Sequence, residues 1–198
     1  MNDRHFTPNF EGRRALVLHR PHELVEALSR QLRQLGVTPL TAWPEMADAT
    51  AADLLFFDAD MGFDGQFPWP EGMAPMPTIA LIGSEAPGRL AWAIRQGADA
   101  HLLKPIGSGG VFSALVIASE AFARRAAMRA ERDGLRTRLG KRQLVAEATA
   151  CLMVQNDLPA TLAYDLLRRR AMEAQLTIEA MAERITGALR DPNVRDRA

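Results

Sequence analysis

The chain has 198 residues, of which 47% are apolar and 24% are charged, so it can bury a sizeable core and is not a disordered protein. Its single cysteine, Cys151, excludes an internal disulfide and a multi-cysteine zinc site. The chain has no apolar stretch of about 18 residues and no apolar signal core in residues 1–13, which predicts a cytoplasmic protein without a membrane segment.

The formal net charge is zero, but the two halves differ. Residues 1–110 contain 9 Lys and Arg against 13 Asp and Glu, whereas residues 111–198 contain 15 against 11. The C-terminal half is therefore the half that we expect to meet a polyanion.

Five short apolar runs in the first half predict buried β-strands. Helical patterns lie between them, one with leucines at three- and four-residue spacing that stops at Gly36, and one over residues 90–94 that stops at Gly97. Strands that alternate with helices are typical of a parallel sheet covered on both faces, because parallel strands need crossover connections. We therefore predict a doubly wound, five-stranded α/β domain with strands at residues 15–18, 37–42, 54–57, 78–82 and 101–103.

The loop over residues 61–77 contains too many prolines for a regular helix. Phe67 and Trp69 in this loop allow two interpretations. They could form an exposed patch that binds a partner, or the loop could pack down on its own aromatic rings.

One long helix is predicted from Val111. Its first turns would cover the sheet through Leu115, Ala118 and Phe122. Beyond them a weaker apolar spacing of seven and four residues suggests a short coiled coil, although Gly134 and Gly140 lower helix propensity. Homodimerisation through this seam is a hypothesis; its residues are Ala121, Met128, Leu135 and Leu139.

A basic run overlaps the end of this helix. Residues 124–142 include eight Lys and Arg against two acidic residues. Such a run is often only a solvated helix face, but it also suits contact with phosphates, with an affinity that falls steeply as salt rises.

Residues 142–189 predict three short amphipathic helices, because small and apolar residues recur there at three- and four-residue spacing. Pro159 suits the first turn of a helix and Thr177 suits an N-cap, so both breaks carry start signals.

The order Ala148 to Met153, a polar break, Leu162 to Met172 and then Met181-Ala182 resembles the ANTAR module of the AmiR and NasR type of transcription antiterminator. The resemblance implies binding to paired RNA hairpins in a nascent transcript, dimerisation through the preceding helix, and a ligand-sensing protein as partner. One departure is Ala148-Thr149-Ala150, where the family usually has Ala-Lys-Gly. The RNA-binding residues that we predict are Arg138, Lys141, Arg142, Thr149, Tyr164, Arg168 and Arg169. Tyr164 could stack on an unpaired base or serve as a core aromatic.

The run Asp53 to Asp58 and the run Gly97 to Pro105 resemble strand ends of response-regulator receiver domains. The resemblance implies a receiver or flavodoxin-like fold in which Asp58 accepts a phosphoryl group, Lys104 contacts it, and the Lys104-Pro105 bond is cis.

Receivers hold a divalent cation with carboxylates after the first strand, but this chain has His19 and Arg20 there. The usual hydroxyl residue after the fourth strand is also replaced, by Ile82, although Ser84 follows. We therefore predict a degenerate receiver in which Asp58 pairs with Lys104 or Arg20 as a structural ion pair.

These predictions divide the chain into a degenerate receiver-like domain (1–118), a helical linker (119–141), an ANTAR-like three-helix domain (142–190) and a tail (191–198). The function predicted is RNA-binding transcription antitermination, controlled by a ligand-sensing protein partner through the non-phosphorylated receiver-like domain. The alternatives are a protein-interaction regulator without RNA binding, which Thr149 and Ala150 favour, and a receiver phosphorylated on Asp58. We expect no enzyme activity, cofactor or metal site; His19 and His22 lack a third ligand.

Overall fold

The computed structural model describes residues 8–190. The chain forms two compact units, divided between Ala127 and Met128. The predicted tail, residues 191–198, lies outside the described residues.

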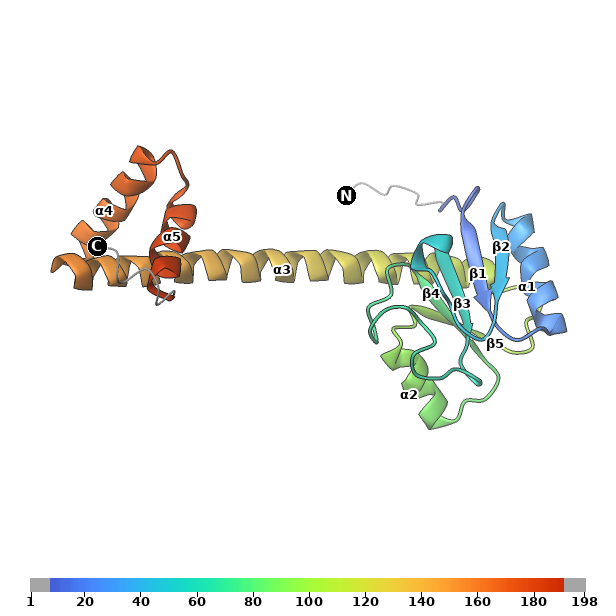
Figure 1. The fold of residues 1–198 in the computed structure, drawn as a ribbon. Coiled ribbons are helices and arrows are strands. Elements are labelled where there is room, and N and C mark those ends of the chain that lie inside the picture. The colour runs from blue at the N-terminus through green and yellow to red at the C-terminus, as the bar shows by residue number, and fades with distance from the viewer. Residues whose placement is uncertain (1–7, 191–198) are drawn as a thin grey trace, which may run out of the picture. The chain divides into compact units, whose positions relative to one another are not determined.

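The first unit is built on one parallel sheet of five strands (Figure 1). Its order is β2-β1-β3-β4-β5, and a short 3-10 turn, η1 (Ala49–Ala51), precedes β3. The doubly wound α/β prediction is confirmed, and all five expected strands are present. Their bounds are β1 (Arg14–Leu18), β2 (Thr38–Ala42), β3 (Leu54–Asp58), β4 (Thr78–Ile82) and β5 (Ala100–Leu103).

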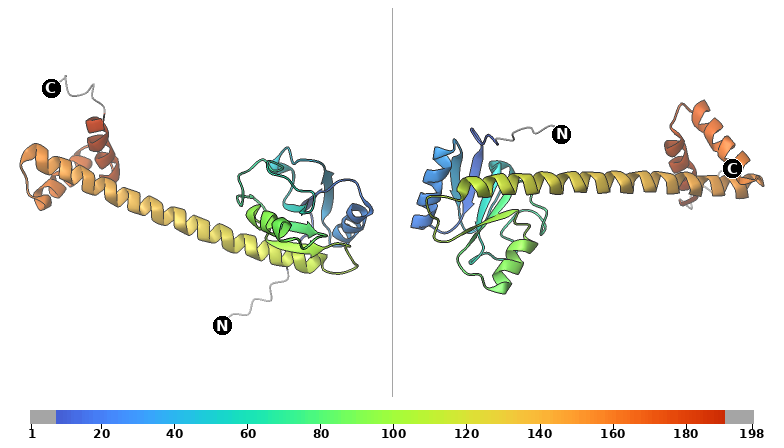
Figure 2. Two further views of the ribbon diagram at one scale, coloured as in Figure 1. Left: turned by 90° about the horizontal axis from the view of Figure 1, so that it is seen from below. Right: turned by 180° about the vertical axis from the view of Figure 1, so that it is seen from behind.

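Helices cover both faces of the sheet (Figure 2). On one face, α1 (Glu23–Gln34) and the first turns of α3 (Val111–Asn156) pack against side chains such as Val17 and Phe56. Neighbouring side chains in each strand, such as Phe57, point to the other face. Burial on both faces explains why β3 and β4 are apolar along their length.

The second face is covered by α2 (Pro87–Arg95) and by the proline-rich loop between β3 and β4. Phe67 stacks on Trp69 with ring centres 5.4 Å apart and meets the edge of Phe57 at 5.5 Å. The loop is thus packed on its own aromatics, which decides between the two interpretations of Phe67 and Trp69. In α2 the buried residues are Trp92 and Ala93, whereas Ile94, part of the helical pattern in the sequence, points outward.

Helix α3 is 46 residues long and continues without a break through Gly134 and Gly140. The linker helix and the first of the three predicted C-terminal helices are therefore one element, which corrects the expectation of three short helices. A glycine costs only about 1 kcal/mol in a helix interior, and the surrounding Arg, Leu and Ala residues are good helix formers.

In the second unit the last turns of α3 pack with α4 (Ala160–Glu173) and α5 (Ile178–Arg190). Pro159 is the N-cap of α4, and the Thr177 hydroxyl accepts a hydrogen bond from the backbone N–H of Ala180 at 3.2 Å before α5. Both predicted start signals lie at helix starts. The core residues are small or apolar: Ala148, Leu152, Ala163, Leu167, Ala171, Met181 and Ala182.

None of the helices within residues 8–190 combines the length and the apolar character needed to cross a membrane.

Candidate functional site

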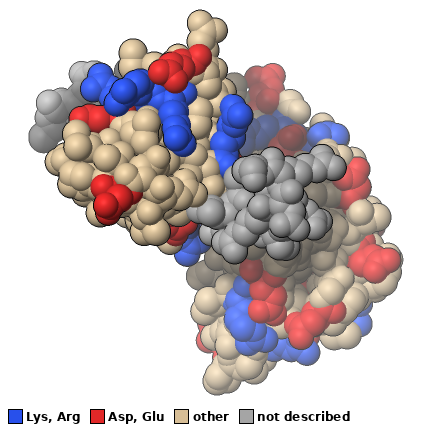
Figure 3. All heavy atoms as spheres, turned by 60° about the vertical axis from the view of Figure 1, so that its left-hand side comes forward, with Lys and Arg blue, Asp and Glu red and all other residues tan. Residues whose placement is uncertain are grey.

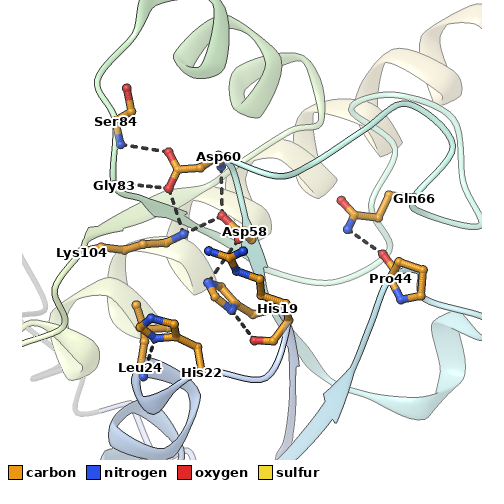
Figure 4. Close-up of polar contacts among 11 residues, drawn as sticks. His19, His22, Leu24, Pro44, Asp58, Asp60, Gln66, Gly83, Ser84 and Lys104 are labelled. Carbon is orange, nitrogen blue, oxygen red and sulfur yellow. Dashed lines mark hydrogen bonds and ion pairs between the residues drawn. The ribbon is translucent and has the colours of Figure 1, made fainter.

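The carboxyl ends of β1, β3 and β5 bring His19, Asp58 and Lys104 together at one edge of the sheet (Figure 4). Asp60 joins them from the loop after β3. These residues line a concavity of about 610 Å³ beside the point where the strand order reverses, which is where ligands bind in open α/β folds.

Both carboxylate oxygens of Asp58 are engaged, and its side chain is only 1% exposed. Lys104 Nζ donates to Asp58 Oδ1 at 2.6 Å, and His19 Nε2 lies 3.2 Å from Asp58 Oδ2. The backbone N–H of Asp60 also donates to Asp58 Oδ1, at 3.0 Å. The predicted pair between Asp58 and Lys104 is present, and the second partner of Asp58 is His19 where the sequence suggested Arg20.

The His19 ring is buried and its Nδ1 lies 2.7 Å from the backbone oxygen of Arg20. A carbonyl oxygen can only accept, so Nδ1 carries a proton. The other ring nitrogen faces a carboxylate, which also accepts.

Asp60 accepts three hydrogen bonds: 2.9 Å from Lys104 Nζ, 2.8 Å from the Gly83 N–H and 2.9 Å from the Ser84 N–H. Burial acts to raise the pKa of Asp60, but these donors together lower it below its ordinary value. A side chain at Gly83 would place Cβ 2.7 Å from Asp60 Oδ2, so this close approach requires glycine.

The divalent cation of a receiver does not fit this set of side chains. Mg²⁺ prefers oxygen ligands, yet the end of β1 offers His19 and Arg20, and the Asp58 oxygens already face Lys104 and His19. The donors that would meet a phosphoryl group, Lys104 and the N–H groups after β4, are bonded to Asp60 instead. The arrangement is a hydrogen-bonded network that holds the strand ends together.

His19 and Asp60 were missed by the sequence interpretation as partners of Asp58 and Lys104. The only sequence feature that could have identified them is their position. His19 directly follows a strand, and Asp60 lies two residues after Asp58. His22 accepts from the Leu24 N–H at 3.1 Å as the N-cap of α1. Over residues 8–190 there is no group of three or more His, Cys, Asp or Glu placed to hold a metal ion.

A second candidate site lies in the C-terminal unit, in a concavity of about 370 Å³. Three of the predicted RNA-binding cations, Arg138, Lys141 and Arg142, line it from α3, and Tyr164 lines it from α4. Residues three and four apart share one face of a helix, which explains why the α3 side chains converge. Figure 3 shows Lys and Arg side chains close together on this unit, with separate acidic side chains around them. Val145, Ile178 and Glu179 complete the lining.

The remaining predicted RNA-binding residues lie outside this lining. Thr149 is two turns beyond Arg142 on the same face of α3, and its hydroxyl donates to the Val145 carbonyl at 2.7 Å. Arg168 and Arg169 are exposed on α4, and Arg168 lies one turn from Tyr164 on the same face.

Arginines in the first part of the basic run have partners of their own. Arg125 donates to both carboxylate oxygens of Asp99 and to the Gly97 carbonyl. Arg132 pairs with Asp133 at 3.2 Å. From Arg136 to Arg142, at the end of the run, the basic side chains form no ion pairs within residues 8–190.

The fold and these sites define a receiver-like regulatory domain, with a network of His19, Asp58, Asp60 and Lys104 at its strand ends, followed by a small helical domain with a basic concavity. A family model of the AmiR N-terminal domain matches residues 13–119, and a model of the ANTAR domain matches residues 133–185. The chain belongs to the AmiR N-terminal family and has the architecture of an AmiR/NasR-type antiterminator. These domains support an RNA-binding antitermination function of the response-regulator type and are regulatory, not enzymatic, in kind.

No curated protein sequence matches the chain significantly. Similar solved structures include Rec1 of ShkA in complex with c-di-GMP, with 21% identity over 57% of this chain and 94% of that chain and a TM-score of 0.42. Full-length FixJ from B. japonicum has 15% identity over 91% of this chain and 97% of that chain, with a TM-score of 0.44. NtrX from Brucella abortus in complex with ATP has 19% identity over 69% of this chain and 34% of that chain, with a TM-score of 0.40.

Proposed function

We propose that the protein binds paired hairpins in a nascent transcript through the concavity of its C-terminal unit and so prevents termination in the cytoplasm. The observation that carries this proposal is the convergence of Arg138, Lys141 and Arg142 on the half-exposed ring of Tyr164. Cations that contact phosphates supply affinity, and an exposed aromatic ring supplies a stacking surface for an unpaired base.

The test is a gel-shift titration with paired-hairpin RNA at two salt concentrations. The double variant Lys141→Ala/Arg142→Ala should bind more weakly and show a salt slope smaller by about 2, because two phosphate contacts are lost. Arg30→Ala, which removes an exposed cation from the first unit, should leave binding unchanged. Equal binding of hairpin and unstructured RNA by the wild-type protein would refute the proposal.

Control of the receiver-like unit is proposed to come from a ligand-sensing protein partner, without phosphorylation. The network of His19, Asp58, Asp60 and Lys104 supports this proposal, because no carboxylate there is free to bind Mg²⁺ and accept a phosphoryl group. Incubation with acetyl phosphate and Mg²⁺ should give no base-labile adduct. A partner that co-purifies with the native protein should be released by a small molecule; an adduct on Asp58 would favour the phosphorylated receiver instead.

A homodimer is proposed through the exposed apolar side chains of α3. Met128, Leu135 and Leu139 are each at least half exposed. Arg125, which lies three residues before Met128, is turned to Asp99. Apolar side chains at this spacing on one helix face suit a second copy of the same helix.

One observation favours the alternative of a regulator without RNA binding. The Thr149 hydroxyl donates to its own helix backbone, and neither Thr149 nor Ala150 supplies a cation beside the concavity. If the wild-type protein binds RNA weakly, the variant Thr149→Lys distinguishes the RNA-binding function from a regulator without RNA binding. A gain in affinity for paired hairpins supports the RNA-binding function, whereas no gain supports the alternative.

A further inference from the structure

Glu179 is an acidic residue in an otherwise cationic site. It lies in the first turn of α5 and lines the same concavity as Arg138, Lys141 and Arg142. Among the residues that the structure describes, none forms an ion pair or hydrogen bond with the side chain of Glu179, so these cations leave its carboxylate free. A negative charge beside a phosphate-binding surface lowers affinity for any polyanion, so it needs a compensating role if RNA binds here.

We propose that Glu179 reads a single unpaired guanine that enters this concavity from the RNA. The inference rests on the proposed RNA-binding function and deepens it, because it names the base and the residue that selects it.

The hydrogen-bonding chemistry of the bases favours guanine. A carboxylate only accepts hydrogen bonds and has two oxygens side by side. The Watson–Crick edge of guanine offers two neighbouring donors, N1–H and the 2-amino group, so both oxygens can be satisfied at once. Adenine and cytosine present an unprotonated ring nitrogen on this edge, and uracil presents carbonyl oxygens beside its one N–H. These acceptors would face the carboxylate and repel it.

The shape of the site suits one base. Its volume of about 370 Å³ is near the lower end of the range for small-molecule pockets. Tyr164 is 45% exposed, so its ring is available for stacking, and Val145 and Ile178 give the concavity an apolar lining. A flipped-out base would thus be stacked on Tyr164, while its Watson–Crick edge meets Glu179.

The cations have a separate role in this arrangement. Arg138, Lys141 and Arg142 lie within about one turn of each other on α3 and form no ion pairs within residues 8–190. They are free to contact the phosphates on either side of the flipped base. Phosphate contacts carry no sequence information, so base selection in this site is left to Glu179 and the stacking ring.

The experiment uses the full-length protein and hairpin pairs with a fixed stem. The uridine loop carries one guanosine, inosine or adenosine, moved through the loop positions in turn. At one position the wild-type protein should bind guanosine about tenfold or more tightly than adenosine, with inosine between them, since inosine lacks the 2-amino donor. Glu179→Gln should lose this preference while binding all-uridine loops as well as, or better than, the wild type. Glu173→Gln on the exposed surface of α4 should retain the preference.

A spectroscopic readout locates the base. Tyr164 is the only tyrosine of the chain, so 3-fluorotyrosine labelling gives one ¹⁹F resonance from the site. The resonance should shift with guanosine loops, and the shift should be reduced in Glu179→Gln. Circular dichroism confirms that each variant is folded.

The outcomes separate the two proposals. Equal binding of all loops by the wild type, or a guanosine preference that survives in Glu179→Gln, overturns the role of Glu179 and leaves RNA binding intact. Failure of the wild type to bind any hairpin pair overturns the proposed function and this inference together.

Discussion

The carboxylates of Asp58 and Asp60 lie close together at the carboxyl end of β3 in the receiver-like unit. Lys104 bonds to both of them, and His19 faces Asp58. Buried charges are stable only when they are paired, and each of these has a partner at 3.2 Å or less. We infer that these side chains take the place of the cation and the phosphoryl group of a receiver.

Asp60→Asn tests this replacement through pH dependence. The folded-state pKa of Asp60 lies below its ordinary value of 3.8, so folding favours the ionised form. Its contribution to stability is present above pH 3.8 and is lost as the pH falls through the lowered pKa. We expect Asp60→Asn to reduce the free energy of unfolding by about 2 kcal/mol near neutral pH.

Urea unfolding near neutral pH and at about pH 3 measures the difference, which should shrink at the lower pH. Glu85→Gln, an exposed carboxylate after β4, is the control and should change little. A difference that grows on acidification would contradict the assignment.

Gly62, like Gly83, is a position where close packing requires glycine. A Cβ there would lie 2.0 Å from the buried ring of Trp92, which cannot move away cheaply. Gly62→Ala should reduce the free energy of unfolding by about 1–3 kcal/mol, as overpacking does in other cores. Gly88→Ala, where a Cβ meets nothing within 4 Å, is the matched control and should be neutral or slightly stabilising. Thermal unfolding of both variants checks the contrast; equal loss in both would refute the packing argument.

At the scale of elements, the strands were predictable because a buried parallel strand must be apolar on both faces, and Leu54 to Phe57 is such a run. The pairing of Asp58 with Lys104 was predictable in the same way, since the ends of parallel strands meet at one edge. The contact of Asp58 with His19 in place of Arg20 was not predictable, because it depends on which of two adjacent side chains turns inward.

The packing of the loop between β3 and β4 and the continuity of α3 also lay beyond the sequence patterns. Phe67 and Trp69 could be exposed or buried on composition alone, and only their stacking against the sheet decides it. Gly140 resembles a helix end in sequence, but the residues on both sides propagate the helix through it.

Arg125 belongs to the basic run in the sequence, but in the fold it makes a tertiary contact with a carboxylate. Its guanidinium binds Asp99, which is almost fully buried, and so ties α3 to the start of β5. Burial raises the pKa of Asp99, although Thr78 and Arg125 act in the opposite direction. Arg125→Met leaves this carboxylate without its cation and should cost about 3 kcal/mol of unfolding free energy at neutral pH.

The loss in Arg125→Met should become smaller as the pH is lowered, because a protonated Asp99 no longer needs a cation. Arg124→Met, which removes the exposed neighbouring cation, should be close to neutral. Denaturant unfolding at two pH values checks both. If the two variants behave alike, Arg125 has no special anchoring role.

At the scale of the whole molecule, α3 is common to both units, because its first turns belong to the sheet core and its last turns to the three-helix core. Between these cores its apolar side chains Met128, Leu135 and Leu139 are exposed. A dimer through this segment would give one molecule two basic concavities, one for each of two paired hairpins. Linked sites bind much more tightly than single ones when both can be engaged.

Leu135→Glu tests this link between assembly and RNA affinity. Leu135 is half exposed, so the change should leave the free energy of unfolding of the monomer within about 0.5 kcal/mol, but it places two like charges at the seam of a dimer. Light scattering at micromolar concentration should show a dimeric wild type and a monomeric variant. The affinity for paired hairpins should fall by about tenfold or more, while the affinity for a single hairpin stays the same. Ala130→Glu, on the opposite side of α3, should remain dimeric and keep both affinities. A monomeric wild type, or a dimer that persists in Leu135→Glu, would show that dimerisation through this face of α3 does not explain the binding of paired hairpins.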